Sequence, residues 1–115
     1  MANNANIKII TENKKARFNY EVVEGFEAGL VLKGSEVKSI RLGKVNIQDA
    51  FCLIRNGEAF IHNMNIQPYP YSTYENHNPT EVRKLLLHKR EIMRLLGKIQ
   101  QKGYSLVPLK LYFKD

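Results

Sequence analysis

The alternation of apolar and polar positions predicts two strands in the first third of the chain. In residues 17–23, RFNYEVV, aromatic or aliphatic side chains occupy every second position, which is the period of a strand. The apolar run FEAGLVL predicts a second strand over residues 26–32, and Gly29 inside it indicates a bulge or a sharp bend. Residues 1–12 precede both strands and are rich in Asn, so we expect a flexible N-terminus there.

A short helix is predicted directly after the second strand, where Gly34 and Ser35 interrupt the apolar run. Ser35 is a residue type that caps helix N-termini, and Gly43 is a type that ends helices. Val37 and Ile40 are three residues apart and therefore lie on one side of such a helix. We expect that side to be buried.

The clearest predicted element is a β-hairpin. The dipeptide Asn56-Gly57 separates two apolar runs and is the strongest short signal for a two-residue hairpin turn. The partner strands are predicted over residues 47–55 and 58–66. Residues 67–81 contain several prolines and other turn formers, which predicts a long loop.

A second helix is predicted to begin near His88. The i, i+3, i+4, i+7 spacing of one buried stripe is followed by Ile92, Leu95, Leu96 and Ile99. Gly103 fits the C-terminal end of this helix, and the three leucines before His88 break the rhythm, which indicates an extended lead-in. Residues 104–113 alternate as a strand, in which Pro108 indicates an edge or a bulge.

The predicted order of elements indicates one mainly β domain over residues 13–115. A chain of 115 residues with 43% hydrophobic content is long enough for a single core. The strands are short and joined by turns, with helices inserted between them. This pattern favours a small antiparallel β-barrel with two or three inserted helices, of the oligonucleotide-binding (OB) class.

The charge of the chain favours a polyanionic partner. The chain has 18 basic and 11 acidic residues, a formal net charge of +7, which is typical of proteins that bind nucleic acid. The excess lies in two blocks, residues 33–48 at net +3 and residues 83–115 at net +7. No apolar run approaches the roughly 20 residues of a membrane helix, so we expect no membrane partner. The lone Cys52 lies in an apolar run, and we expect a buried, inert thiol in a cytoplasmic protein.

The residue types that bind metals or carry catalysis are scattered. His62, His77 and His88 fall on separate predicted elements without ligand spacing, and the sequence contains neither a P-loop nor a nucleophile elbow. We therefore predict no catalytic residue, no metal site and no cofactor. Two alternatives remain: a general OB-type binder of single-stranded nucleic acid, and a nuclease that uses Glu27 and His88.

Aromatic side chains next to basic or polar ones are the stronger signal. They occur at Arg17, Phe18 and Tyr20, and again in the long loop at Tyr69, Tyr71 and Tyr74. This combination suits contact with an RNA backbone together with stacking on bases. We assign Phe26 and Phe60 to the core, whereas for Phe18 and Phe51 a core position and a binding position are equally compatible with the pattern.

Several stretches together resemble the SmpB family of bacterial SsrA-binding proteins. The most specific are FEAG, LKGSEVKS, RKLLLHKREI and GYSLVPL, which follow in this order from about Asn13 onward. The resemblance implies an OB-like barrel that binds the tRNA-like domain of transfer-messenger RNA (tmRNA). It also implies a monomeric adaptor, not an enzyme, that reaches stalled ribosomes with tmRNA and elongation factor Tu and lies near the decoding region of the small subunit.

The resemblance also implies which residues contact RNA. Glu27 of FEAG, together with Leu86 and His88 of KLLLH, matches positions where the family contacts the tRNA-like domain. Phe18 matches a position associated with the decoding centre, where relatives often have His. The full set that we expect to face the ribosome is Arg17, Phe18 and Phe51. Charge placement adds candidates for phosphate contacts, namely Lys38, Arg41, Lys44, Arg83, Lys84, Lys89 and Arg90.

The family continues beyond LYFKD with a further strand and a strongly basic tail that enters the message channel of the ribosome. The sequence here ends at Asp115. We therefore expect a truncated or partly observed protein, with an open barrel edge, whose core still binds tmRNA.

Overall fold

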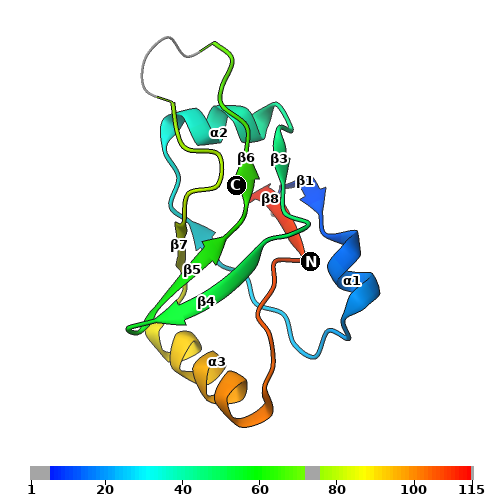
Figure 1. Cartoon of the computed structure of the whole chain (residues 1–115), viewed down its shortest axis with the longest axis vertical. Helices are drawn as coiled ribbons and strands as arrows, with labels where there is room; N and C mark the ends of the chain where they lie inside the picture. Colours follow the sequence, from blue (N-terminus) through cyan, green and yellow to red (C-terminus); the bar gives the residue numbers. More distant parts are fainter. Residues whose placement is uncertain (1–5, 72–75, 115) are drawn as a thin grey trace.

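A four-stranded antiparallel sheet forms the centre of the molecule (Figure 1). The computed structural model describes residues 6–71 and 76–114. The sheet has the order β2-β7-β5-β4, with β2 at Gly29–Leu30, β7 at Arg83–Leu86, β5 at Glu58–His62 and β4 at Phe51–Arg55. Two further pairs form separate sheets: β1 (Ile7–Glu12) with β8 (Lys110–Lys114), and β3 (Val45–Asn46) with β6 (Asn65–Ile66).

The described part of the chain contains three helices, which lie around these strands. In Figure 1, α2 (Gly34–Arg41) lies at one end of the molecule and α3 (Lys89–Lys102) at the other, with α1 (Lys14–Asn19) to one side. The predicted class, mainly β with helices, is therefore confirmed, and every strand pair is antiparallel. Among the described residues the three sheets stay separate, so a closed barrel is not found.

The hairpin is confirmed, with a two-residue turn. Asn56 and Gly57 both have positive φ, 53° and 76°, which the primed hairpin turns require. Arg55 then pairs with Glu58. The outer parts of the predicted strands are wrong, because Asn63 has φ 59° and interrupts the second strand. The chain resumes pairing only in β6, with β3 as its partner.

The second helix is confirmed at both ends. His88 is the N-cap of α3, and Gly103 follows it in the left-handed conformation with φ 68°. Ile92 and Leu95 of the predicted stripe are buried. The predicted extended lead-in is β7, which pairs with β2 and β5.

The predicted strand over residues 17–23 is wrong, because Asn13 starts a helix instead. The Asn13 Oδ1 accepts a hydrogen bond from the backbone N–H of Ala16 at 2.9 Å, which caps the first turn of α1. Ala16 is buried, whereas Phe18 is 91% exposed. The apparent alternation therefore does not lie on one face of a sheet.

Three other local predictions also differ from the structure. Of the strand predicted over residues 26–32, Gly29–Leu30 forms β2, and one more backbone hydrogen bond joins Val31 to Lys84. The predicted flexible segment 1–12 contains β1, whose backbone groups pair with those of β8. In the strand predicted over 104–113, Leu106 makes a single bridge to Cys52 and regular pairing starts only at Lys110, because Pro108 lacks a backbone N–H.

The predicted short helix is confirmed, but its start is not Ser35. Lys33 is the N-cap of α2, and the Lys33 backbone N–H donates to Glu36 Oε1 at 2.8 Å. The Ser35 hydroxyl instead lies 2.9 Å from Nδ1 of the buried His77. Ile40 is buried and Val37 half-buried, and Gly43 has φ 74°, which confirms the predicted face and the predicted end. Between β6 and β7 the described residues contain no helix or strand, as the loop prediction requires.

The core lies between the four-stranded sheet, α2 and the smaller strand pairs. It is formed by Ile40, Ile47, Ala50, Ile61, Met64 and Ile66. Cys52 packs against this cluster, and burial raises the pKa of its thiol to about 12. The expectation of an inert thiol is consistent with this environment.

Alkylation of Cys52 is expected to be slow in the folded protein. At pH 8 the reagent needs the thiolate, and a thiol of pKa about 12 supplies roughly a thousandth of the thiolate of an exposed cysteine. The reaction of the native chain with iodoacetamide, compared with that of the chain in concentrated urea, measures this difference. Similar rates in the two conditions would contradict the burial of Cys52.

Candidate nucleic-acid interface

Glu27, Leu86 and His88 come together at the β2–β7 edge. Gly29 pairs with Leu86, so Glu27 lies two residues beyond this pair on one strand and His88 two residues beyond it on the other. A Cβ at Gly29 would lie 3.2 Å from the Leu86 Cβ, and the glycine therefore allows close approach of the two strands. Leu86 is 52% exposed and presents an apolar surface at this edge.

The Glu27 carboxylate has two partners on β8 that the sequence did not indicate. Tyr112 donates its hydroxyl hydrogen bond to Oε2, and Lys114 Nζ lies 2.9 Å from Oε1. The hydrogen bond from Tyr112, reinforced by Lys114, lowers the pKa of Glu27. Glu27 is thus ionised at neutral pH and held in one orientation as an acceptor. In the sequence, these partners of Glu27 were indicated only by the net positive charge of residues 83–115.

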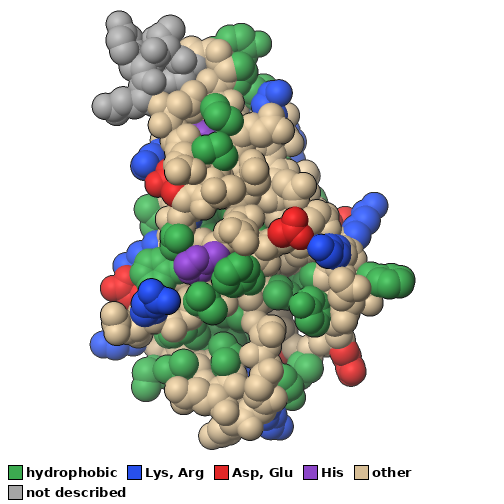
Figure 2. All heavy atoms as spheres, in the orientation of Figure 1, with side chains coloured by type: hydrophobic (Ala, Val, Ile, Leu, Met, Phe, Trp, Pro, Cys, Tyr) green, Lys and Arg blue, Asp and Glu red, His purple; other side chains and the backbone are tan. Residues whose placement is uncertain are grey.

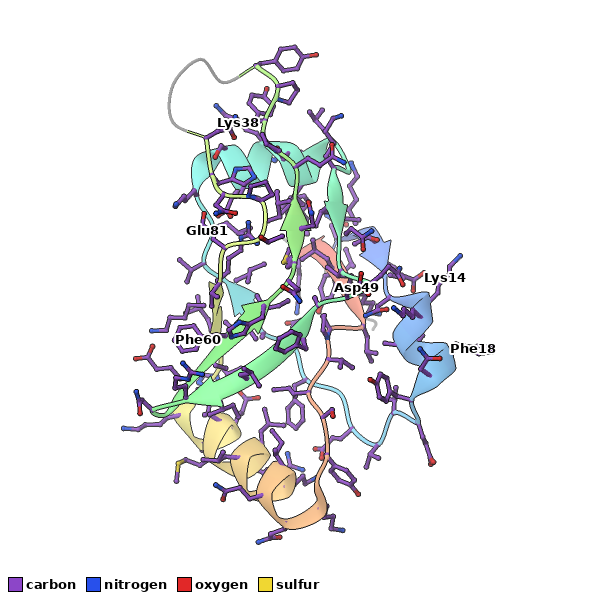
Figure 3. The ribbon with its side chains drawn as sticks, viewed as in Figure 1. Lys14, Phe18, Lys38, Asp49, Phe60 and Glu81 are labelled. Atoms are coloured by element: carbon purple, nitrogen blue, oxygen red, sulfur yellow. The ribbon has the colours of Figure 1, made fainter. Side chains whose placement is uncertain are left out.

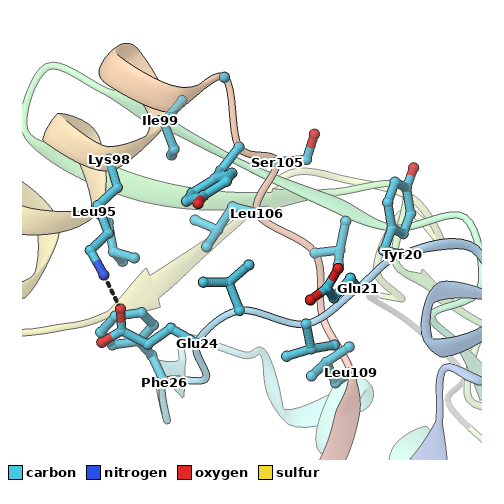
Figure 4. A pocket seen from close by; sticks show the side chains of 15 residues that line it. Tyr20, Glu21, Glu24, Phe26, Leu95, Lys98, Ile99, Ser105, Leu106 and Leu109 are labelled. Atoms are coloured by element: carbon cyan, nitrogen blue, oxygen red, sulfur yellow. Dashed lines mark hydrogen bonds and ion pairs between the residues drawn. The ribbon is translucent and has the colours of Figure 1, made fainter.

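The irregular segment before β2, residues 20–28, is attached to α3. Glu24 forms ion pairs with Arg94 and Lys98, and the hydrogen bond from Lys98 lowers the pKa of Glu24. The Arg94 guanidinium also lies 5.6 Å from the centroid of the Phe26 ring. Figure 4 shows the Glu24–Lys98 contact at the edge of an apolar cleft of about 610 Å³ between this segment, α3 and residues 103–109. Phe26 is half-buried there and lies outside the buried core, so its predicted core position is wrong.

The basic side chains around His88 are exposed, as an interface requires. Lys89 and Arg90 occupy the first turn of α3, directly after the His88 N-cap. The His88 backbone N–H donates to Glu91 Oε1 at 2.9 Å, so the imidazole is not needed for that cap. Lys84 is also exposed but has a partner, Glu58, at 3.2 Å.

Arg83 is a correction, since it is buried and does not reach the surface. Only 2% of its side chain is exposed, and its Nε pairs with the equally buried carboxylate of Glu36. Its other nitrogens donate to the carbonyls of Met64, Asn78 and Pro79. Each of the three guanidinium nitrogens thus donates to an acceptor inside the protein, and the buried side chain cannot reach a phosphate. Glu36 is as buried as Arg83 and is equally unavailable to a ligand at the surface.

Lys38, Arg41 and Lys44 are exposed on α2 and the turn after it, which leaves them accessible for the phosphate contacts that the sequence predicts. Lys38 Nζ lies 5.6 Å from the centroid of the Tyr69 ring, and the Arg41 guanidinium lies 5.9 Å from that of Phe113. Figure 3 shows Lys38 directed toward the long loop beside α2. Tyr74 of the same loop lies outside the described residues.

The three residues expected to face the ribosome lie on two elements. Arg17 and Phe18 are exposed on α1, and Figure 3 shows Phe18 pointing away from the rest of the molecule. Phe51 is on β4 and stacks on His62, with ring centroids 5.2 Å apart and an interplanar angle of 6°. The two-residue turn at Asn56-Gly57 sets the pairing of Phe51 with His62. The stacking of these two rings could therefore have been predicted from the sequence.

The outer face of the hairpin is partly apolar. Leu53 is exposed there and pairs with Phe60. The predicted core position of Phe60 is wrong, because its side chain is half-buried. Ala59 and Ile61 alternate with it and are buried, which places Phe60 on the opposite side of the pleat. Figure 2 shows hydrophobic and histidine side chains gathered on the face over β4 and β5.

Metal ligands do not cluster within residues 6–71 and 76–114. His77 is buried and its Nε2 lies 2.8 Å from the carbonyl of Ile66, while Nδ1 faces Ser35. Because a carbonyl only accepts, Nε2 carries the hydrogen and Nδ1 accepts from the Ser35 hydroxyl. Among the helices in this part of the chain, none has the length and hydropathy of a membrane span.

A basic, mainly β domain with exposed aromatic side chains and inserted helices defines the class of small nucleic-acid-binding domains. The chain belongs to the SmpB protein family, whose model matches residues 10–115.

Curated relatives support this assignment over most of the chain. The SsrA-binding protein of Geobacter sulfurreducens is 59% identical over 108 residues, which cover 94% of this chain and 71% of the relative. The SsrA-binding protein of Synechococcus elongatus is 55% identical over 116 residues, covering all of this chain and 75% of the relative. A solved structure described as "tmRNA-SmpB: a journey to the center of the bacterial ribosome" is 52% identical, with a TM-score of 0.73, over 90% of this chain and 72% of that chain.

Proposed function

We propose that this protein is an RNA-binding adaptor that binds the tRNA-like domain of tmRNA and delivers it to stalled ribosomes in trans-translation. Family membership supports the proposal, since its relatives are SsrA-binding proteins and its structural neighbour is a tmRNA-SmpB complex of the bacterial ribosome. The protein acts by binding and not by catalysis. It works in the cytoplasm as a monomer on the RNA, reaches elongation factor Tu only through tmRNA, and has an OB-like arrangement of its strands.

The observation that carries the RNA contact is the β2–β7 edge. Leu86 and His88 follow Glu27 by 59 and 61 positions in the sequence, and the pairing of Gly29 with Leu86 brings all three residues to this edge. The oriented carboxylate of Glu27 accepts hydrogen bonds from base edges or ribose hydroxyls, and exposed Leu86 packs on an unstacked base. Lys89 and Arg90 beside His88 supply charge for the phosphates.

The test is the affinity of the chain for the tRNA-like domain of tmRNA, compared with an ordinary tRNA and an unstructured RNA of equal length. We expect tight, selective binding that Leu86→Ala weakens roughly tenfold, since base packing contributes about 1–3 kcal/mol. Glu27→Ala is expected to weaken binding and to reduce selectivity. Fluorescence anisotropy at two salt concentrations measures both quantities.

Two surface variants serve as matched controls. Met93→Ala removes an apolar side chain that is 61% exposed on α3, and Glu12→Ala removes an exposed carboxylate on β1. Both are expected to bind like the unaltered chain. Equal, steeply salt-dependent binding to all three RNAs would instead identify a general single-strand binder. The adaptor proposal would then be withdrawn.

A further inference from the structure

We propose that Glu24 is a specificity-determining residue, which keeps two cations of α3 from binding RNA without selectivity. The two cations are Arg94 and Lys98, and both pair with the Glu24 carboxylate. The inference rests on the proposed function, because it concerns how an RNA-binding adaptor avoids RNAs other than its partner. Such discrimination uses elements that disfavour the wrong ligand as well as contacts that favour the right one.

A row of three cations follows α3. Arg90, Arg94 and Lys98 are spaced four residues apart, so successive members are neighbours on the helix surface and lie about 6 Å apart along its axis. The row begins two residues after His88, the N-cap that lies at the β2–β7 edge. A row of unpaired cations binds the phosphates of an RNA whatever its sequence. If all three were unpaired, α3 would therefore attract any RNA strand.

Glu24 neutralises the last two members of this row. Its Oε2 accepts a hydrogen bond from Arg94 Nη2 at 2.5 Å, and its Oε1 pairs with Lys98 Nζ, the contact drawn in Figure 4. The two carboxylate oxygens thus bind two separate cations, as two oxygens of a phosphate would. The side chains of Arg94 and Lys98 remain 56% and 36% exposed. The ion pairs, and not burial, therefore keep these cations from a phosphate.

The cations that stay unpaired are those nearest the proposed tmRNA contacts. In the part of the chain that the structure describes, Lys89 and Arg90 at the start of α3 have no carboxylate partner. Glu24 itself lies three residues before Glu27. The free positive charge of this end of the helix thus lies beside the edge where Glu27 contacts RNA, whereas the charge farther along α3 is compensated.

A purely structural role for Glu24 makes a different prediction. If its ion pairs served only to attach residues 20–28 to α3, their loss would loosen Glu27 and weaken binding to tmRNA. It would not strengthen binding to any other RNA. Release of two cations instead strengthens binding to RNA of any sequence. The change in affinity for an unstructured RNA therefore separates the two roles.

The test measures binding of the whole chain to an unstructured RNA and to the tRNA-like domain of tmRNA over a range of salt concentrations. Glu24→Gln is expected to strengthen binding to the unstructured RNA roughly tenfold at about 0.1 M salt. It is also expected to steepen the salt slope by about 1.4, since each phosphate contact with a single strand contributes about 0.7. Binding to the tRNA-like domain is expected to change less than about threefold, so selectivity falls.

Two further variants serve as controls. Glu21 is exposed on the same segment and has no ion pair among the described residues. Glu21→Gln makes the same change in net charge and is expected to leave the salt slope unchanged and the affinity within about twofold. A triple variant that combines Glu24→Gln with Arg94→Gln and Lys98→Gln lacks the released cations, and the gain is expected to disappear.

The unstructured RNA decides the outcome. Equal effects of Glu24→Gln and Glu21→Gln overturn the proposal, because net charge alone would explain them. The proposal also fails if Glu24→Gln brings no gain, or if the gain persists in the triple variant. A lack of selectivity in the unaltered chain contradicts the proposed function instead, so the two failures are distinguishable.

Discussion

Replacement of Arg83 by Met is expected to lower the free energy of unfolding by about 3–5 kcal/mol, because it leaves the buried Glu36 carboxylate without its cation. The variant also removes the guanidinium donor from the carbonyls of Met64, Asn78 and Pro79, of which Asn78 and Pro79 keep a backbone donor. Urea unfolding followed by circular dichroism measures the change. The Arg83 side chain connects β7 to α2 and to the loop, so its removal is expected to destabilise all three segments.

The adjacent residue on β7 supplies the matched control. Lys84 pairs with Glu58 at 3.2 Å, and both side chains are about half exposed. Lys84→Met is therefore expected to change the free energy of unfolding by less than about 1 kcal/mol, because water screens an exposed pair. Similar losses in the two variants would show that the Glu36–Arg83 pair has no special contribution.

The pH dependence of Arg83→Met tests the same cause. Without the guanidinium, the ionised Glu36 carboxylate is a buried charge without a partner in the folded variant. Acid that protonates this carboxyl removes the unpaired charge. The stability deficit relative to the unaltered chain is thus expected to shrink as the pH is lowered toward 4. Glu36→Gln combined with Arg83→Met removes the charge and is expected to recover part of the loss.

Asn13→Ala is expected to destabilise the protein by about 2–4 kcal/mol, through loss of a helix cap and of two further hydrogen bonds, one buried and one partly buried. Asn13 is only 1% exposed. Its Oδ1 caps α1, and its Nδ2 donates to the carbonyls of Ile47 and Pro108 at 3.1 and 2.9 Å. One side chain thereby connects α1, the core residue Ile47 and the segment before β8.

The Asn13 prediction has a control on the same helix. Asn19 is exposed at the end of α1, and Asn19→Ala is expected to change the free energy of unfolding by less than about 0.5 kcal/mol. Asn13→Asp keeps the cap but directs a carboxylate at two carbonyls, so it is expected to be destabilising at neutral pH. A loss below about 1 kcal/mol in Asn13→Ala would contradict the connecting role. Urea unfolding measures all three variants.

Both predictions bear on the candidate interfaces. Asn13 holds the helix that exposes Arg17 and Phe18, and Arg83 binds the carbonyls of Asn78 and Pro79 near the base of the loop beside α2. Buried polar groups thus support surfaces that they do not themselves form. A loss of RNA binding in either variant is therefore to be compared with its loss of stability before a contact is inferred.

The sequence by itself determined the elements whose signals are local. Asn56-Gly57 needs only its own backbone conformation to form the turn, and that turn sets the pairing of Phe51 with His62. The stripe of α3 and the left-handed Gly103 after it are equally local. The family motifs could also be recognised in the sequence, in their usual order. They indicated Glu27, Leu86 and His88 as candidate RNA contacts.

The tertiary structure alone decided which polar groups are buried and which distant segments meet. Arg83 and Lys84 are neighbours in a basic run, but the partner of Arg83 is 47 positions away and removes it from the surface. Asn13 selects a helix over a strand through a cap and through carbonyls at Ile47 and Pro108. The pairing of β1 with β8 likewise joins the two ends of the chain. Such contacts form because a buried polar group needs a hydrogen-bond partner, and here that partner is far away in sequence. A local pattern of residues does not indicate which distant group it is.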